Sequence, residues 1–228
     1  MGRLNLSTHR FLYYITDRIA FADDETTRRN RLLEKIAEAA RAGVDYIQLR
    51  EKDLATRALE SLAREAIVVL KDLRAQHPQL RTRLLINSRS DLALETGADG
   101  VHLRSEDISP RDLRKIWKDT ALPGRHAPII GVSCHSLAEV MKAEADQATL
   151  AVFAPVFGKK DSPASQSVGL NQLHEACKAK IPVLALGGIT LENAQSCLEA
   201  GAAGIAAIRL FQENNVARIV DVVRRLTR

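Results

Sequence analysis

The sequence predicts an α/β protein with the TIM (β/α)8 barrel as its architecture, and two observations support this prediction. First, eight apolar, strand-like runs are distributed along the 228 residues, and a barrel of eight strand–helix units takes roughly 200 to 250 residues. Second, a glycine stands where a helical run must stop before the next strand at three joints, 42–45, 96–99 and 200–203. An open, doubly wound parallel sheet is the rival architecture for this pattern.

The expected strands are short runs rich in Ile, Leu, Val, Phe and Tyr, as buried parallel strands are. The first, 11–17, is apolar until it turns polar at Thr16 and Asp17. The others are expected at 46–49, 84–86, 101–103, 129–132, 150–157, 183–186 and 205–208.

Helices are expected between the strands where apolar residues recur at helical spacing. Leu32, Leu33 and Ile36 mark one helix over about 31–41. Ser109 and Pro110 mark the start of another, because Ser caps a helix well and Pro suits its first turn. Further helices are expected at about 54–75, 91–95, 137–145 and 216–226.

We expect one domain over 1–228, with 1–10 as an N-terminal extension, because no linker or low-complexity tract divides the chain. The net charge of +5 and the pI of about 9.3 raise nucleic acid as a partner. However, the basic residues are scattered among acidic ones, and three Tyr, five Phe and one Trp are too few to indicate a base-stacking surface. Nucleic-acid binding is therefore not expected.

The cysteines and the N-terminus bear on the compartment. Three cysteines without close pairing favour a reduced, cytoplasmic environment. Residues 1–10 lack the apolar core of a signal peptide, and no stretch approaches the ~20 apolar residues of a membrane-spanning helix. We expect a cytoplasmic protein with no membrane partner, and the sequence leaves open whether it forms a homo-oligomer.

The second predicted strand ends in charges where a buried strand would usually pass into a neutral turn. Gln48, Arg50 and Lys52 stand at alternate positions, so an extended backbone would place their side chains on one side. Together they offer amide, guanidinium and ammonium donors, which suit an anion with several oxygens. An active site in a barrel lies at the C-terminal ends of the strands, which is where this set falls.

Phosphate is expected near the ends of the seventh and eighth strands. Gly187 and Gly188 follow the seventh strand and Arg209 ends the eighth, and backbone N–H groups of these loops commonly bind phosphate in barrels. The alternative is that Gly-Gly merely turns the chain. Lys159 and Lys160 begin a polar loop that could fold over an anion, or could equally be a solvated charged loop.

Four further residues are candidates at the same rim. Ser133 and His135 end the fifth strand, and His135 could exchange a proton near neutral pH or simply be a surface residue. His102 is expected to pack within the rim. Asp107 could hold Mg²⁺ through oxygen, or serve as an acid in the first turn of the next helix.

Eight segments in their order along the chain resemble the thiamine phosphate synthase family, which also includes the thiazole tautomerases. The resemblance covers nearly the whole chain, and its most specific part lies between Gln48 and Lys52. The segments are Tyr14–Asp17, Tyr46–Lys52, Ile86–Arg89, Gly97–Leu103, Gly131–Ser136, Ala154–Phe157, Gly187–Ile189 and Gly204–Ala206.

The resemblance implies a TIM barrel that joins hydroxymethylpyrimidine diphosphate to thiazole phosphate and releases diphosphate with Mg²⁺. It implies that the diphosphate is bound by Gln48, Arg50, Lys52, Asn87 and Lys159 or Lys160. It also implies that Ser133 lies beside the pyrimidine, and that Gly188 and the end of the eighth strand hold the thiazole phosphate.

The chain departs from the family pattern at four places. Synthases usually have Asn-Asp where this chain has Asn87-Ser88, so Asp107 is expected to be the remaining carboxylate and Ser88 a weaker metal ligand. They usually have Gly-Gln where Arg104-Ser105 stands, and a Pro-Thr-x-Thr-Lys loop that is shortened here to 158–160. A Ser usual near the end of the eighth strand is Arg209.

Three functions follow as hypotheses. The first is a thiamine phosphate synthase, a transferase, with Arg50 and Lys52 on the diphosphate and Ser133, His135 and Lys160 as the catalytic candidates. The second is a thiazole tautomerase that uses His135 as its acid and base. The third is a non-catalytic barrel that binds phosphorylated thiamine precursors.

Overall fold

Eight parallel strands form a closed barrel in the computed structural model, which describes residues 9–21, 24–120, 126–158 and 167–226. Each strand pairs with its neighbour in sequence, and β8 pairs with β1 to close the ring. The strands are β1 (Phe11–Ile15), β2 (Tyr46–Leu49), β3 (Arg83–Asn87), β4 (Gly100–Leu103), β5 (Ile129–Cys134), β6 (Leu150–Phe153), β7 (Val183–Ala185) and β8 (Gly204–Ala207). The TIM-barrel prediction is confirmed and the open sheet is wrong.

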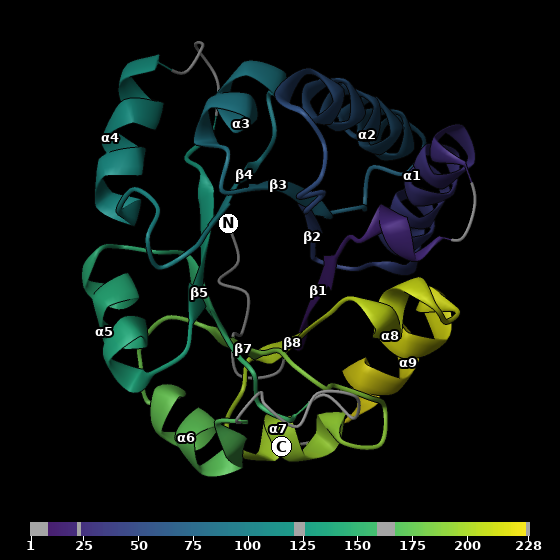
Figure 1. Cartoon of the computed structure of the whole chain (residues 1–228). Coiled ribbons are helices and arrows are strands. Elements are labelled where there is room, and N and C mark those ends of the chain that lie inside the picture. The colour runs from purple at the N-terminus through teal and green to yellow at the C-terminus, as the bar shows by residue number, and fades with distance from the viewer. Residues whose placement is uncertain (1–8, 22–23, 121–125, 159–166, 227–228) are drawn as a thin grey trace.

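The helices surround this barrel (Figure 1). They are α1 (Glu25–Ala42), α2 (Thr56–Gln76), α3 (Ser90–Thr96), α4 (Pro110–Thr120), α5 (Leu137–Ala145), α6 (Gly169–Ala176), α7 (Ala194–Glu199), α8 (Arg209–Gln212) and α9 (Val216–Arg225), with a short 3-10 turn, η1 (Arg18–Ala20), after β1. Within the described residues, no helix is long and apolar enough to cross a membrane.

The two largest differences between the observed and predicted element boundaries lie at α1 and β6. Helix α1 begins at Glu25, well before the apolar periodicity starts, because the side chain of Asp24 accepts a hydrogen bond from the backbone N–H of Thr27 and caps the helix. Strand β6 ends at Phe153, four residues before the expected end at Phe157. The helix-stopping glycines at 43 and 97 are confirmed, since each is the left-handed C-cap of its helix.

Strand alternation divides the apolar core into an inner and an outer layer. Tyr13, Ile15, Leu85, Val152 and Leu184 belong to the cluster inside the barrel. Their neighbours along each strand belong to the larger cluster between the strands and the helices. Side chains alternate between the two faces of a strand. A residue two positions beyond an inner-layer residue therefore also faces the inside of the barrel, one step closer to its C-terminal mouth.

Candidate active site at the C-terminal mouth of the barrel

Four of the predicted site residues extend the inner layer toward the C-terminal mouth. Gln48 is in register with Ile15 and Leu85, and Ser133 with Val152, all of which are inner-layer residues. Asn87 lies two residues beyond Leu85 and pairs in register with His102. Period-two alternation therefore places Gln48, Asn87, His102 and Ser133 on one lining. The amide of Gln48 is buried and lies 3.4 Å from Oδ1 of Asn87.

The cations after β2 lie at the edge of this lining. Arg50 is half-buried and directly follows the strand, whereas Lys52 is exposed and lies in the turn beyond it. The strict alternation predicted for Gln48, Arg50 and Lys52 therefore ends at Arg50. The positive charge of Arg50, then burial, then Arg104 lower the pKa of Lys52, which is the electrostatic signature of neighbouring cations. Among the described residues, no carboxylate forms an ion pair with Arg50 or Lys52.

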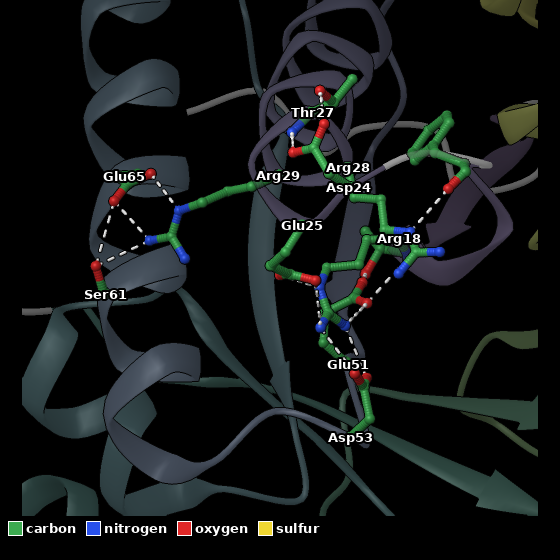
Figure 2. A network of polar contacts seen from close by, with 12 residues as sticks. Arg18, Asp24, Glu25, Thr27, Arg28, Arg29, Glu51, Asp53, Ser61 and Glu65 are labelled. Carbon is green, nitrogen blue, oxygen red and sulfur yellow. Dashed lines mark hydrogen bonds and ion pairs between the residues drawn. The ribbon is translucent and has the colours of Figure 1, made fainter.

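An ion-pair network around the buried side chains of Arg18 and Glu51 fixes the loop that carries these cations (Figure 2). Arg18, with only 3% of its side chain exposed, donates to Oδ1 and Oδ2 of Asp53 at 2.7 Å each and lies 3.3 Å from Glu51. Glu51 also accepts from the backbone N–H of Arg18 at 2.9 Å and from the hydroxyl of Thr16 at 2.5 Å. The same hydroxyl oxygen accepts from the backbone N–H of Arg50 at 3.0 Å. Glu51 thus points inward and contacts Arg18, whereas its neighbours Arg50 and Lys52 do not face Arg18.

The pKa values in this network follow from burial and from Arg18. Burial raises the pKa of Glu51 despite opposing hydrogen bonds from Thr16 and Arg18. The hydrogen bond from Arg18 lowers the pKa of Asp53. Hydrogen bonding to Asp53 also raises the pKa of Arg18, so this guanidinium stays charged. Charge-assisted bonds therefore hold the loop in addition to the packing of Leu54 on the core.

Asp107 and Ser88, the predicted metal ligands, lie together at the ends of β4 and β3. Asp107 accepts from the backbone N–H of Arg104 at 2.8 Å and from its guanidinium at 3.0 Å, and the nearby hydroxyl of Ser88 contributes to lowering its pKa. Burial opposes ionisation, but these hydrogen bonds outweigh it and lower the pKa of Asp107. Within the described residues, no three His, Cys, Asp or Glu side chains gather as a metal site.

This donor set fits Mg²⁺ in one restricted way. Mg²⁺ is commonly bound through one or two carboxylates together with water and substrate phosphates. The ionised carboxylate of Asp107 and the hydroxyl of Ser88 supply the minimum of that arrangement. These residues therefore fit a Mg²⁺ site whose remaining ligands come from water and a phosphorylated substrate.

Ser133 and His135 face different surroundings, although Ser133 lies within β5 and His135 directly follows it. The hydroxyl of Ser133 lies 2.8 Å from Nε2 of His102 inside the mouth, and Nδ1 of that buried ring lies 3.0 Å from the hydroxyl of Tyr13. Burial, then the charge of Arg50, lowers the pKa of His102 to about 3. His135 is exposed, and its Nδ1 lies 2.7 Å from the carbonyl oxygen of Ala154.

Both glycines of the predicted phosphate loop after β7 adopt a backbone conformation that few other residues tolerate. Gly187 and Gly188 have φ values of 102° and 63°, both in the left-handed region that favours glycine. A Cβ at Gly187 would lie 2.7 Å from Cα of Pro155, and one at Gly188 would lie 2.8 Å from Cβ of Phe157. Both positions therefore require glycine, because a side chain would collide with the segment that follows β6.

The remaining predicted site residues are either exposed or lie outside the residues that the structure describes. Arg209 is exposed and begins α8 rather than ending β8, because β8 stops at Ala207. Lys159 and Lys160 lie outside the described residues.

A separate pocket of about 150 Å³ opens beside the mouth between the loop after β4 and α5. Arg104, Asp107 and Ser133 are among the residues that line it.

Comparison with known proteins decides the family. The family described as thiamine monophosphate synthase matches residues 12–211. This chain belongs to the thiamine monophosphate synthase family. It is 36% identical over 199 residues to a thiamine-phosphate synthase of Roseiflexus castenholzii, a match that covers 86% of this chain and 78% of the relative. It is 34% identical over 198 residues to the enzyme of the same name from Clostridium acetobutylicum, covering 86% and 84%.

A solved structure agrees with this assignment. The thiamine phosphate pyrophosphorylase of Pyrococcus furiosus superposes with a TM-score of 0.74 at 29% identity, over 97% of each chain. Membership of the thiamine monophosphate synthase family makes this chain an enzyme of the transferase type and confirms the predicted resemblance.

Sequence reasoning missed two parts of this synthase-family site. It noted Glu51 only as one charge in a run and did not connect it with Arg18, which lies 33 positions away. An available signal was that Glu51 interrupts the cations with the opposite sign. It also gave Tyr13 no role, although alternation from Ile15 would have placed Tyr13 inside the barrel.

Proposed function

We propose that this chain joins hydroxymethylpyrimidine diphosphate to thiazole phosphate, giving thiamine phosphate and diphosphate. The observation that carries the proposal is the pair of cations at the barrel mouth, Arg50 and Lys52. Neither has a carboxylate partner among the described residues, and the loop that presents them is fixed by Arg18. Fixed cations without a protein counter-ion are what a diphosphate requires.

The proposed reaction breaks one bond and forms another. The C–O bond between the pyrimidine methylene and the diphosphate breaks, and its electron pair leaves with the diphosphate. The lone pair of the thiazole nitrogen then forms the new C–N bond at that methylene carbon. Arg50 and Lys52 would stabilise the charge that grows on the leaving oxygen, and that interaction is strongest in the transition state.

The other residues have binding roles in this proposal. Gln48 and Asn87 would hold the diphosphate by their amides, and Ser133 would contact the pyrimidine from the inner face of β5. The backbone at Gly187 and Gly188, with Arg209, would bind the thiazole phosphate. Lys159 and Lys160 remain proposed ligands of the diphosphate. Asp107 and Ser88 would hold Mg²⁺, which when bound would neutralise part of the diphosphate charge.

An assay with purified protein tests the proposal. Given both substrates and Mg²⁺, the protein should form thiamine phosphate and release one diphosphate for each product molecule, as measured by chromatography and a diphosphate assay. Omitting the thiazole phosphate should abolish product. Tight binding of both substrates without turnover would instead support the non-catalytic barrel and contradict the proposal.

We expect Ser88→Asp to lower the Mg²⁺ concentration for half-maximal rate by about tenfold, because a second carboxylate would join Asp107 and each factor of ten corresponds to ~1.4 kcal/mol. The backbone of Ser88 has φ 58°, a region that Asp and Asn tolerate. Ser88→Asn is therefore the matched control, since it has the same shape and conformation without the charge. With diphosphate present, the Mg²⁺-dependent rise in melting temperature should likewise occur at a lower Mg²⁺ concentration in Ser88→Asp than in Ser88→Asn. Equal Mg²⁺ dependence in both variants would show that the metal does not bind here.

One observation favours the thiazole tautomerase as a second candidate. The carbonyl of Ala154 can only accept, so Nδ1 of His135 carries the proton in their 2.7 Å hydrogen bond. In the neutral ring this leaves Nε2 as an acceptor at an exposed position, as a general base requires. Conversion of the thiazole carboxylate phosphate by the wild type, and its loss in His135→Ala, would establish this activity.

A further inference from the structure

Three polar side chains form a line across the inside of the barrel mouth. Tyr13 on β1 is fully buried, and its hydroxyl lies 3.0 Å from Nδ1 of His102 on β4. Nε2 of the same ring lies 2.8 Å from the hydroxyl oxygen of Ser133 on β5. His102 is only 3% exposed. Only Ser133, which is partly exposed, meets the space where substrate would lie.

The available donors and acceptors decide which group donates in each of these hydrogen bonds. Burial raises the pKa of Tyr13 well above its ordinary value, so the phenol keeps its proton. In the described part of the chain, the one hydrogen-bond partner of that hydroxyl is His102. If Nδ1 carried the ring proton, the phenolic proton would be buried without an acceptor, which is the costly arrangement. The phenol therefore donates to Nδ1.

The rest of the line follows from the chemistry of a neutral imidazole. With Nδ1 accepting, Nε2 carries the proton and donates to the oxygen of Ser133. The hydroxyl proton of Ser133 is then directed away from the ring, to whatever group lies in the mouth. Ser133 is held as a donor, although an isolated serine both donates and accepts.

The packing around His102 restricts its ring to this position. Gly131 on β5 lies beneath it, and a Cβ there would lie 2.9 Å from Nδ1. The ring of Tyr13 in turn packs edge-on against Tyr46, with centroids 5.7 Å apart. The imidazole is thus confined between a residue with no side chain and a buried aromatic pair.

We propose that Tyr13 and His102 are positioning residues that make Ser133 an obligatory hydrogen-bond donor to the substrate heterocycle. This inference rests on the proposed function, because it requires that Ser133 contact the heterocycle. It goes beyond that function by specifying the ligand: the ring must present an acceptor atom, such as an unprotonated ring nitrogen, to Ser133. A heterocycle with a protonated nitrogen there would leave the hydroxyl proton of Ser133 without that acceptor and should bind more weakly.

The ring tautomer is the first test and needs no substrate. Long-range ¹H–¹⁵N spectra of the wild type should show His102 with a protonated Nε2 and an unprotonated Nδ1, assigned by loss of the signals in His102→Gln. Tyr13→Phe should shift the Nδ1 signal or mix the tautomers. Tyr14→Phe is the matched control, since Tyr14 is equally buried but donates outward to Gln212 at 3.1 Å. It should leave the spectrum unchanged.

Kinetics provide the second test. Tyr13→Phe should lower kcat/KM about tenfold, and Tyr14→Phe no more than twofold at a similar loss of melting temperature. His102→Gln can place an N–H close to the original Nε2 and should keep most of the activity. His102→Met has no donor and should lose at least tenfold more than His102→Gln.

Two results would overturn the inference. One is a wild-type ring with its proton on Nδ1, and the other is equal kinetic loss in Tyr13→Phe and Tyr14→Phe. A wild-type protein that makes no thiamine phosphate would contradict the proposed function instead, and the spectra would still report the tautomer. The failures of the two proposals are therefore distinguishable.

Discussion

Arg50→Ala is expected to lower kcat/KM for thiamine phosphate formation by about 10²–10³-fold, the loss typical when one fixed donor to a developing negative charge is removed. The reason is that Arg50 is a half-buried cation at the inner edge of the mouth with no carboxylate partner among the described residues. Without Arg50, the negative charge that develops on the departing diphosphate is neutralised only in part by Lys52, which is exposed in the next turn. Steady-state kinetics with both substrates measure the effect.

Two other variants make this result interpretable. Arg225→Ala removes an exposed arginine that pairs with Asp221 on α9, away from the mouth, and should leave kcat/KM unchanged. His135→Ala separates the two enzymatic hypotheses, because the synthase reaction should survive it and the tautomerase reaction should not. Full activity of Arg50→Ala together with loss in His135→Ala would contradict the roles proposed for these residues.

The barrel could be predicted from the sequence because its signals are local and repeated. Apolar runs of three to eight residues, three of them preceded by a helix-stopping glycine, identify the strand–helix units. Boundaries were less accurate where a polar cap rather than an apolar residue begins the helix, as at Asp24. Arg209 was misplaced for a related reason, since a four-residue helix such as α8 is too short to show helical periodicity.

The site was predictable where residue type alone suggests chemistry. Strand ends rich in donors led to Gln48, Arg50 and Asn87, and the structure places all three at the mouth. The supporting residues were not predictable from such signals, because pairs such as Arg18 with Glu51, or Tyr13 with His102, form only when distant strands come into register. Their partners are set by the closed barrel and not by local sequence.

Arg18→Met is expected to lower the free energy of unfolding by about 3–5 kcal/mol, because it leaves the buried carboxylate of Glu51 without its cation. Glu51 would keep its hydrogen bonds from Thr16 and from the backbone of residue 18, but these do not neutralise its charge. Urea denaturation measures the loss. Arg29→Met is the matched control, since Arg29 forms two hydrogen bonds to Glu65 (Figure 2). Both side chains of this pair are partly exposed, and surface pairs contribute about 0–1 kcal/mol.

The double variant Arg18→Met with Glu51→Gln distinguishes a buried charge from a simple packing defect. If the destabilisation arises from the uncompensated carboxylate, the double variant should be more stable than Arg18→Met alone, because glutamine is neutral and still accepts from Thr16. If the defect is packing, the second substitution should lower stability further. Because the same hydroxyl of Thr16 also holds the backbone of Arg50, kcat/KM should fall in Arg18→Met and not in Arg29→Met. Such a result would tie the stability of the loop directly to the placement of Arg50, the proposed diphosphate ligand.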